Sequence, residues 1–179
     1  MDNLFSALSK SPFGSLIDPS NIKLPTKQPG DLKFNRLLTI PKLSINCVYD
    51  ECRKHFLCQN NLEDFDFFIS KNERSPVSAY AIWVCDNPEP DQIYIGKSAD
   101  DVKALGICSE TFLERLVHEL SYFLDTGKHL DVLKETLCCG SRYSNGGVPC
   151  VYWFKGELKY DWVNTRTKGG PFGCREVRG

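Results

Sequence analysis

The sequence has no apolar run that approaches the roughly 18 residues a helix needs to cross a membrane. Its N-terminal segment also lacks a basic region followed by an unbroken apolar stretch, which a secretory signal would require. Charge of one sign is not in excess, because 22 basic residues face 23 acidic ones. These absences predict a cytoplasmic protein without membrane contact. The apolar fraction of 41% is enough to build a globular domain.

The sequence also lacks a complete phosphate-binding motif. Gly96, Lys97 and Ser98 could close a P-loop, but that motif requires a glycine at the position of Asp91. We therefore interpret this segment as the end of a strand followed by the cap of a helix.

The chain has nine cysteines, and this odd number argues against a disulfide framework. We expect most of them to be small buried apolar side chains, with no metal and no cofactor. Structural zinc is the alternative, because Cys47, Cys52, His55 and Cys58 supply suitable ligand types, although without a C-x2-C pair. A composite zinc site would instead use Cys138 or Cys139, Cys150 and Cys174.

The pattern of apolar residues predicts an α+β fold. The most regular element is a helix at about 109–126, where apolar residues recur at helical spacing and Gly127 follows as a stop signal. Lys155 and Gly156 separate two alternating segments and predict a hairpin. We expect a small, mostly antiparallel sheet packed against this one long amphipathic helix, in a single domain spanning 36–179.

The other elements are less regular. Residues 1–35 are rich in proline and turn residues, which predicts an extended or partly disordered N-terminal arm. A second short helix is expected at 98–106, with Ser98 as its N-cap. Further strands are expected at 64–70, 77–86 and 92–96.

Charge is unevenly distributed along the chain. The segment from Asp86 to Thr126 contains nine acidic and three basic residues. The segment from Lys134 to Gly179 contains eight basic and four acidic residues. The first segment predicts an acidic surface that could mimic a phosphate backbone. The second favours contact with an anionic partner.

The basic C-terminal part contains the candidate binding site. Loop 140–147 is rich in glycine, serine and asparagine, so its backbone N–H groups could face an anion. The hairpin that follows carries aromatic residues on both faces and could stack bases or hold a peptide. The predicted binding residues are Arg142, Tyr143, Asn145, Tyr152, Phe154 and Lys159.

We therefore predict a small cytosolic binding protein without catalysis. It would dock a protein or nucleic-acid partner through loop 140–147 and the aromatic, basic hairpin, or through the acidic surface. Two enzyme classes are the alternatives.

The first alternative is a metal-dependent nuclease. Residues 80–82, Tyr-Ala-Ile, followed by 94–96, Tyr-Ile-Gly, resemble the opening hairpin of GIY-YIG nucleases. The resemblance implies phosphodiester hydrolysis at a metal held by Glu114 or Glu119. The following helix, at 98–106, lacks the arginine that this family uses there.

The second alternative is a cysteine-dependent hydrolase. Cys138 or Cys139 would be its nucleophile, paired with His118 or with His129 and Asp131. No local signature of a cysteine hydrolase surrounds these residues.

Overall fold

The computed structural model describes residues 8, 11–26, 31–60 and 64–179, and its fold is α+β. Within these ranges, no helix is long and apolar enough to cross a bilayer. Short 3-10 turns occur at Gly14–Leu16, Pro19–Asn21 and Gln92–Tyr94. The helices and strands, in chain order, are β1 (Phe34–Ile40), α2 (Ile45–His55), α3 (Phe65–Phe68), β2 (Lys71–Asn72), β3 (Tyr80–Cys85), α4 (Ala99–Ala104), α5 (Phe112–Thr126), β4 (Glu135–Leu137), β5 (Ser141–Arg142), β6 (Val148–Phe154), β7 (Glu157–Val163), β8 (Phe172–Gly173) and β9 (Val177–Arg178).

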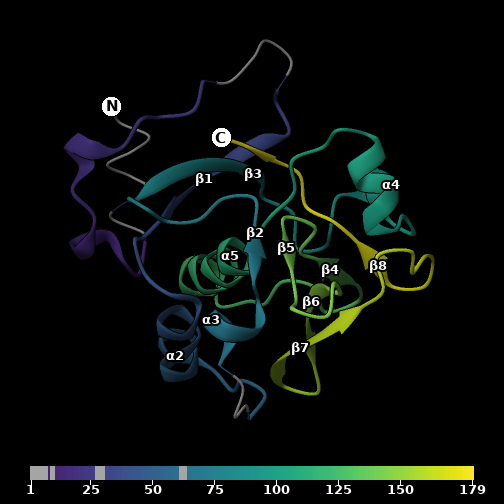
Figure 1. The fold of residues 1–179 in the computed structure, drawn as a ribbon. Helices are drawn as coiled ribbons and strands as arrows, with labels where there is room; N and C mark the ends of the chain where they lie inside the picture. The colour runs from purple at the N-terminus through teal and green to yellow at the C-terminus, as the bar shows by residue number, and fades with distance from the viewer. Residues whose placement is uncertain (1–7, 9–10, 27–30, 61–63) are drawn as a thin grey trace.

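Helix α5 lies at the centre of the molecule, and the strands around it do not form the single sheet that we predicted (Figure 1). The described strands form three sheets, with the orders β1-β3-β9, β2-β5 and β7-β6-β4-β8. Only β4 and β8 pair in parallel; the other pairs are antiparallel. The division has a physical reason, since α5 is buried on every side from Phe112 to Tyr122. One flat sheet could cover only one side of it.

Helix α5 begins at Phe112, later than the predicted start at about 109, because Thr111 is its N-cap. The Thr111 hydroxyl accepts a hydrogen bond from the Glu114 N–H, while the Glu114 carboxylate accepts one from the Thr111 N–H. Gly127 ends the helix with a φ of 67°, as its sequence position predicts. The hairpin β6–β7, the strand β3 and the helix α4 also lie within their predicted segments.

Two strand predictions are wrong. The segment 64–70 contains the helix α3, because the Asp64 carboxylate caps it by accepting from two backbone N–H groups. The segment 92–96 contains the 3-10 turn Gln92–Tyr94, and its backbone is bonded to the C-terminal segment, with the Gly96 N–H donating to the Phe172 carbonyl. Strand β3 therefore pairs with β1 and β9, and the nuclease-like hairpin is not formed.

The predicted N-terminal arm lies partly outside the described residues, which omit 1–7, 9–10 and 27–30. In the described part, the apolar side chains of Phe13, Ile17 and Ile22 are buried in the main core. The indole N–H of Trp83 in β3 donates to the Pro25 carbonyl. This part of the segment thus covers the sheet of β1 and β3.

The cysteine side chains are mostly buried, as expected. All nine lie in the described residues, none is in a disulfide bond, and six are buried. Cys139, Cys150 and Cys174 belong to a second apolar cluster with Val102 of α4 and Val148 of β6. Cys139 of this cluster also lines a pocket beside loop 140–147.

Candidate functional site

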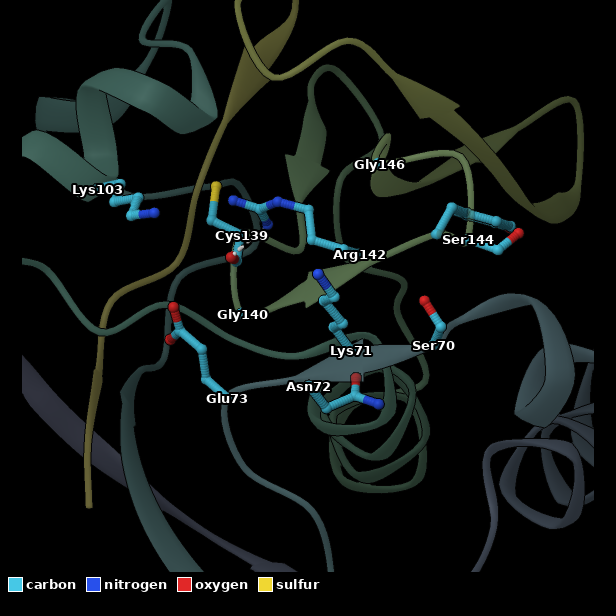
Figure 2. A pocket seen from close by; sticks show the side chains of 11 residues that line it. Ser70, Lys71, Asn72, Glu73, Lys103, Cys139, Gly140, Arg142, Ser144 and Gly146 are labelled. Atoms are coloured by element: carbon cyan, nitrogen blue, oxygen red, sulfur yellow. Dashed lines mark hydrogen bonds between the residues drawn. The ribbon is translucent and has the colours of Figure 1, made fainter.

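A cavity of about 490 Å³ opens beside loop 140–147 (Figure 2). Its walls come from three parts of the chain, namely 70–73 with strand β2, helix α4, and 139–146 with strand β5. The antiparallel pairing of β2 with β5 holds the first and third of these together. The lining residues are Ser70, Lys71, Asn72, Glu73, Lys103, Cys139, Gly140, Arg142, Tyr143, Ser144 and Gly146.

Basic side chains dominate the lining of this pocket. Lys71, Lys103 and Arg142 reach it from β2, α4 and β5, and Glu73 is the one acidic residue among the lining residues (Figure 2). Neither lysine has an ion-pair partner among the residues that the structure describes, whereas Glu73 lies 3.9 Å from the Arg74 guanidinium. The pocket is therefore electropositive and suited to an anion.

Arg142 is held at the pocket by the backbone beside it. Its Nη1 donates to the carbonyl oxygens of Cys139, at 2.7 Å, and of Ser141, at 2.6 Å. These two bonds use one nitrogen of a guanidinium that carries five N–H donors. The remaining donors can bind a ligand without reorientation of the side chain.

Most backbone N–H groups of loop 140–147 are not available to an anion as we predicted, because the protein itself uses them. Side chains, and not the peptide backbone, supply the positive charge of the pocket. The internal bonds run from the N–H of Ser141 to Cys138 O, Tyr143 to Gly147 O, Ser144 to Phe68 O, Gly146 to Tyr143 O and Gly147 to Asn145 Oδ1.

Gly140 fixes the loop against the start of α5. A Cβ atom at this position would lie 2.8 Å from the Ser109 carbonyl oxygen and 3.0 Å from the Thr111 side chain, so only glycine fits. Its N–H donates to the Glu110 carbonyl, and its carbonyl accepts from the Glu73 N–H. The pocket therefore stands on a rigid base.

Exposed aromatic residues lie near loop 140–147. Phe67 and Phe68 at the end of α3 are 71% and 36% exposed, and the Phe68 carbonyl accepts from the Ser144 N–H of the loop. Trp162 of β7 is 49% exposed, and its ring covers Gly147 so closely that a Cβ there would lie 2.6 Å away. Aromatic residues thus contact the loop at Ser144 and at Gly147.

The structure brings together only part of the predicted site. Arg142 and Tyr143 line the pocket, and Asn145 caps the turn between them and Gly147. Lys71 and Lys103, which were not predicted from the sequence, complete the basic lining.

The other three predicted residues belong to the hairpin and do not line this pocket. Tyr152 packs against the second apolar cluster. Lys159 forms an ion pair with Glu157, so its charge is compensated within β7. Phe154 at the end of β6 is half exposed.

The acidic surface expected between 86 and 126 is not formed as predicted, because four of its nine acidic side chains are buried. A count of charges along the chain cannot distinguish a solvated carboxylate from one paired in the core. Glu114 pairs with Arg74 at 2.6 Å, and Glu119 pairs with Arg115 at 2.9 Å. The buried acids are Asp91, Glu110, Glu114 and Glu119.

The predicted cysteine–histidine pair is not formed either. Nδ1 of His118 lies 2.7 Å from Glu110, and Nδ1 of His129 lies 2.9 Å from Glu119. In the described residues, no hydrogen bond joins either histidine to Cys138 or Cys139. Burial raises the pKa of the Cys138 thiol, which makes it a poor nucleophile.

Potential metal ligands are dispersed. Across the described ranges, no three side chains of His, Cys, Asp or Glu are grouped so that they could hold a metal ion. Of the residues in the zinc alternative, Cys47 is exposed while Cys52 is buried. Glu114, a metal ligand in the nuclease alternative, accepts hydrogen bonds from Arg74 and from the Tyr80 hydroxyl.

No protein-family model, curated protein or solved structure matches this chain. The chemistry of the pocket is therefore the basis for a functional assignment. That chemistry combines three basic side chains, a rigid loop and exposed aromatic rings.

Proposed function

We propose that this protein binds single-stranded nucleic acid without catalysing a reaction on it. A backbone phosphate would lie in the pocket, in contact with Lys71, Lys103 and Arg142. The observation that supports this best is the convergence of these three basic side chains, from three separate elements, on one cavity. Charge-assisted bonds from lysine and arginine to phosphate oxygens are the dominant source of affinity in such complexes.

The exposed aromatic rings favour a single strand over a duplex. Stacking of an unpaired base on an aromatic side chain contributes about 1–3 kcal/mol, and the bases of a duplex are not free to stack in this way. Phe68, next to Phe67, accepts a hydrogen bond from the middle of the loop at Ser144, and Trp162 covers its end at Gly147. A single nucleic-acid strand with one phosphate in the pocket could place neighbouring bases against these aromatic residues. We also propose the cytosol as its location, which the nine free thiols support.

The Lys71→Glu variant is expected to bind a fluorescent single-stranded oligonucleotide at least about tenfold more weakly than the wild type does, because it reverses a charge at the phosphate. Fluorescence anisotropy measures this difference. The matched control is Lys128→Glu, which makes the same change of net charge at an exposed lysine after α5, outside the pocket lining.

The dependence of affinity on salt tests the phosphate contact. One phosphate neutralised in the pocket predicts a slope of about −0.7 for the logarithm of affinity against that of salt concentration in a single-strand complex. Lys71→Glu should bring this slope closer to zero. Equal losses in the Lys71 and Lys128 variants would contradict the assignment, and so would a wild type that binds peptides but no oligonucleotide at low salt.

A further inference from the structure

We propose that Cys139 and Cys174 form a redox-active pair. A hydroperoxide oxidises Cys139 through the pocket, and Cys174 then closes a disulfide bond with it. This chemistry goes beyond nucleic-acid binding and does not depend on it.

The fold brings the two thiols together. Cys139 follows β4 and Cys174 follows β8, and these strands pair in parallel, with Thr136 opposite Gly173. Both side chains belong to the same buried apolar cluster, and each thiol changes the pKa of the other.

Access to the two thiols is unequal. Cys139 lines the pocket, where Figure 2 shows its sulfur beside the Arg142 guanidinium. Cys174 is fully buried behind it, in the second apolar cluster. A small oxidant in the pocket therefore meets Cys139 first, and Cys174 is placed to resolve the product.

The electrostatic surroundings of the thiols also favour oxidation of Cys139 before Cys174. The interaction with Cys174 lowers the pKa of the Cys139 thiol, and together with the Arg142 charge it outweighs burial. The same interaction raises the pKa of Cys174. Burial raises the pKa of Cys138 and Cys150. Since the thiolate is the nucleophile, Cys139 is the most reactive of these buried thiols.

The reaction balances in two steps with hydrogen peroxide as the oxidant. In the first, the Cys139 thiolate attacks one peroxide oxygen, so that an S–O bond forms and the O–O bond breaks. The departing hydroxide takes up a proton and leaves as water, and Cys139 becomes a sulfenic acid.

In the second step, the Cys174 sulfur attacks the Cys139 sulfur. The S–S bond forms, the S–O bond breaks, and the hydroxide leaves as water with the Cys174 proton. The sulfenic acid is neutral, so the first step removes the Cys139 charge that holds the proton on Cys174. Overall, two thiols and one peroxide give one disulfide and two waters.

Peptide mapping tests the pair. Trypsin releases Cys139 in the peptide 135–142 and Cys174 in the peptide 169–175. After treatment of the folded protein with hydrogen peroxide and blocking of free thiols, mass spectrometry should find these two peptides joined. In the Cys174→Ser variant, the cross-link should be lost and a 1,3-diketone reagent should trap the sulfenic acid of Cys139.

The neighbouring Cys138 provides the matched control, because it lies in the same tryptic peptide. The Cys138→Ser variant should retain the cross-link, and Cys139→Ser should lose it. A cross-link that persists in Cys139→Ser would overturn the proposal. So would a wild type in which Cys139 stays reduced while the exposed Cys47 and Cys108 are oxidised. The experiment contains no oligonucleotide, so its failure would leave the binding function standing.

Discussion

Replacement of Asp131 by asparagine is expected to lower the free energy of unfolding by about 3–5 kcal/mol, because it removes one charge from a buried ion-pair network. Asp131 is fully buried, and its Oδ2 accepts from Arg115 Nε at 2.9 Å and Nη2 at 2.7 Å. Its Oδ1 pairs with Arg175, which is also buried. The variant would leave both guanidinium groups without this carboxylate in the core.

The choice of asparagine isolates the effect of charge. Asp131 has a φ of 57°, a left-handed conformation that asparagine adopts with little strain. The two side chains also have nearly the same shape. Lost stability would therefore report the missing charge and not the backbone.

Urea unfolding measures the loss, with Glu51→Gln as the control. Glu51 pairs with Lys54 at 2.7 Å one helical turn away on the exposed face of α2, and such pairs contribute less than about 1 kcal/mol. If Asp131→Asn cost no more than this control, the buried network would not stabilise the fold in the way that its geometry implies.

Stability is also expected to fall by about 2 kcal/mol between pH 6.5 and about 8, because of Glu110. Burial raises the pKa of this carboxyl group to about 8, against the lowering effect of Arg175 and Arg115. Its Oε2 has no hydrogen-bond partner among the described residues, which also disfavours the charged form. The folded protein therefore holds a proton that the unfolded chain releases above about pH 4.3.

The direction of this change in stability, and the pH range in which it occurs, also depend on His118, the partner of Glu110. Burial lowers the pKa of His118, so the unfolded chain binds a proton below about pH 6.5 that the folded protein does not. Between about pH 4.3 and 6.5 the two effects oppose each other. Above that range only Glu110 acts, and stability decreases as pH rises through its folded pKa.

Comparison of the wild type with Glu110→Gln isolates this contribution. Urea unfolding at a series of pH values should show a slope of up to about −1.4 kcal/mol per pH unit in the wild type above pH 6.5. The glutamine variant should lose that slope. Parallel curves for the two proteins would mean that Glu110 is ionised in the folded state.

Local signals in the sequence predict several elements well. Gly127 ends α5 and Lys155–Gly156 turns the β6–β7 hairpin, because both depend on conformations that glycine adopts easily. The α3 segment was mispredicted because its apolar residues resemble a strand, whereas the Asp64 side chain supplies a helix cap. Helix capping depends on the geometry of a side chain, which the spacing of apolar residues does not reveal.

The binding pocket could be predicted only in part. Arg142 and Tyr143 lie in a loop whose composition marks it as a site. Lys71 and Lys103 are far from that loop in the sequence, and only the pairing of β2 with β5 and the position of α4 bring them to it. The same applies to the placement of Cys139 and Cys174 in one buried cluster, which depends on the parallel pairing of β4 with β8.

The position at which nucleic acid binds is the most direct test of the proposed function. Backbone amide chemical shifts of the isotope-labelled protein would be followed during titration with a single-stranded oligonucleotide. The proposed function predicts that the largest changes lie in 67–73 and 139–147, around Lys71 and Arg142, with smaller changes at the end of α4. Changes confined to the hairpin tip at 152–159, or no changes in these two segments at saturating oligonucleotide, would contradict it.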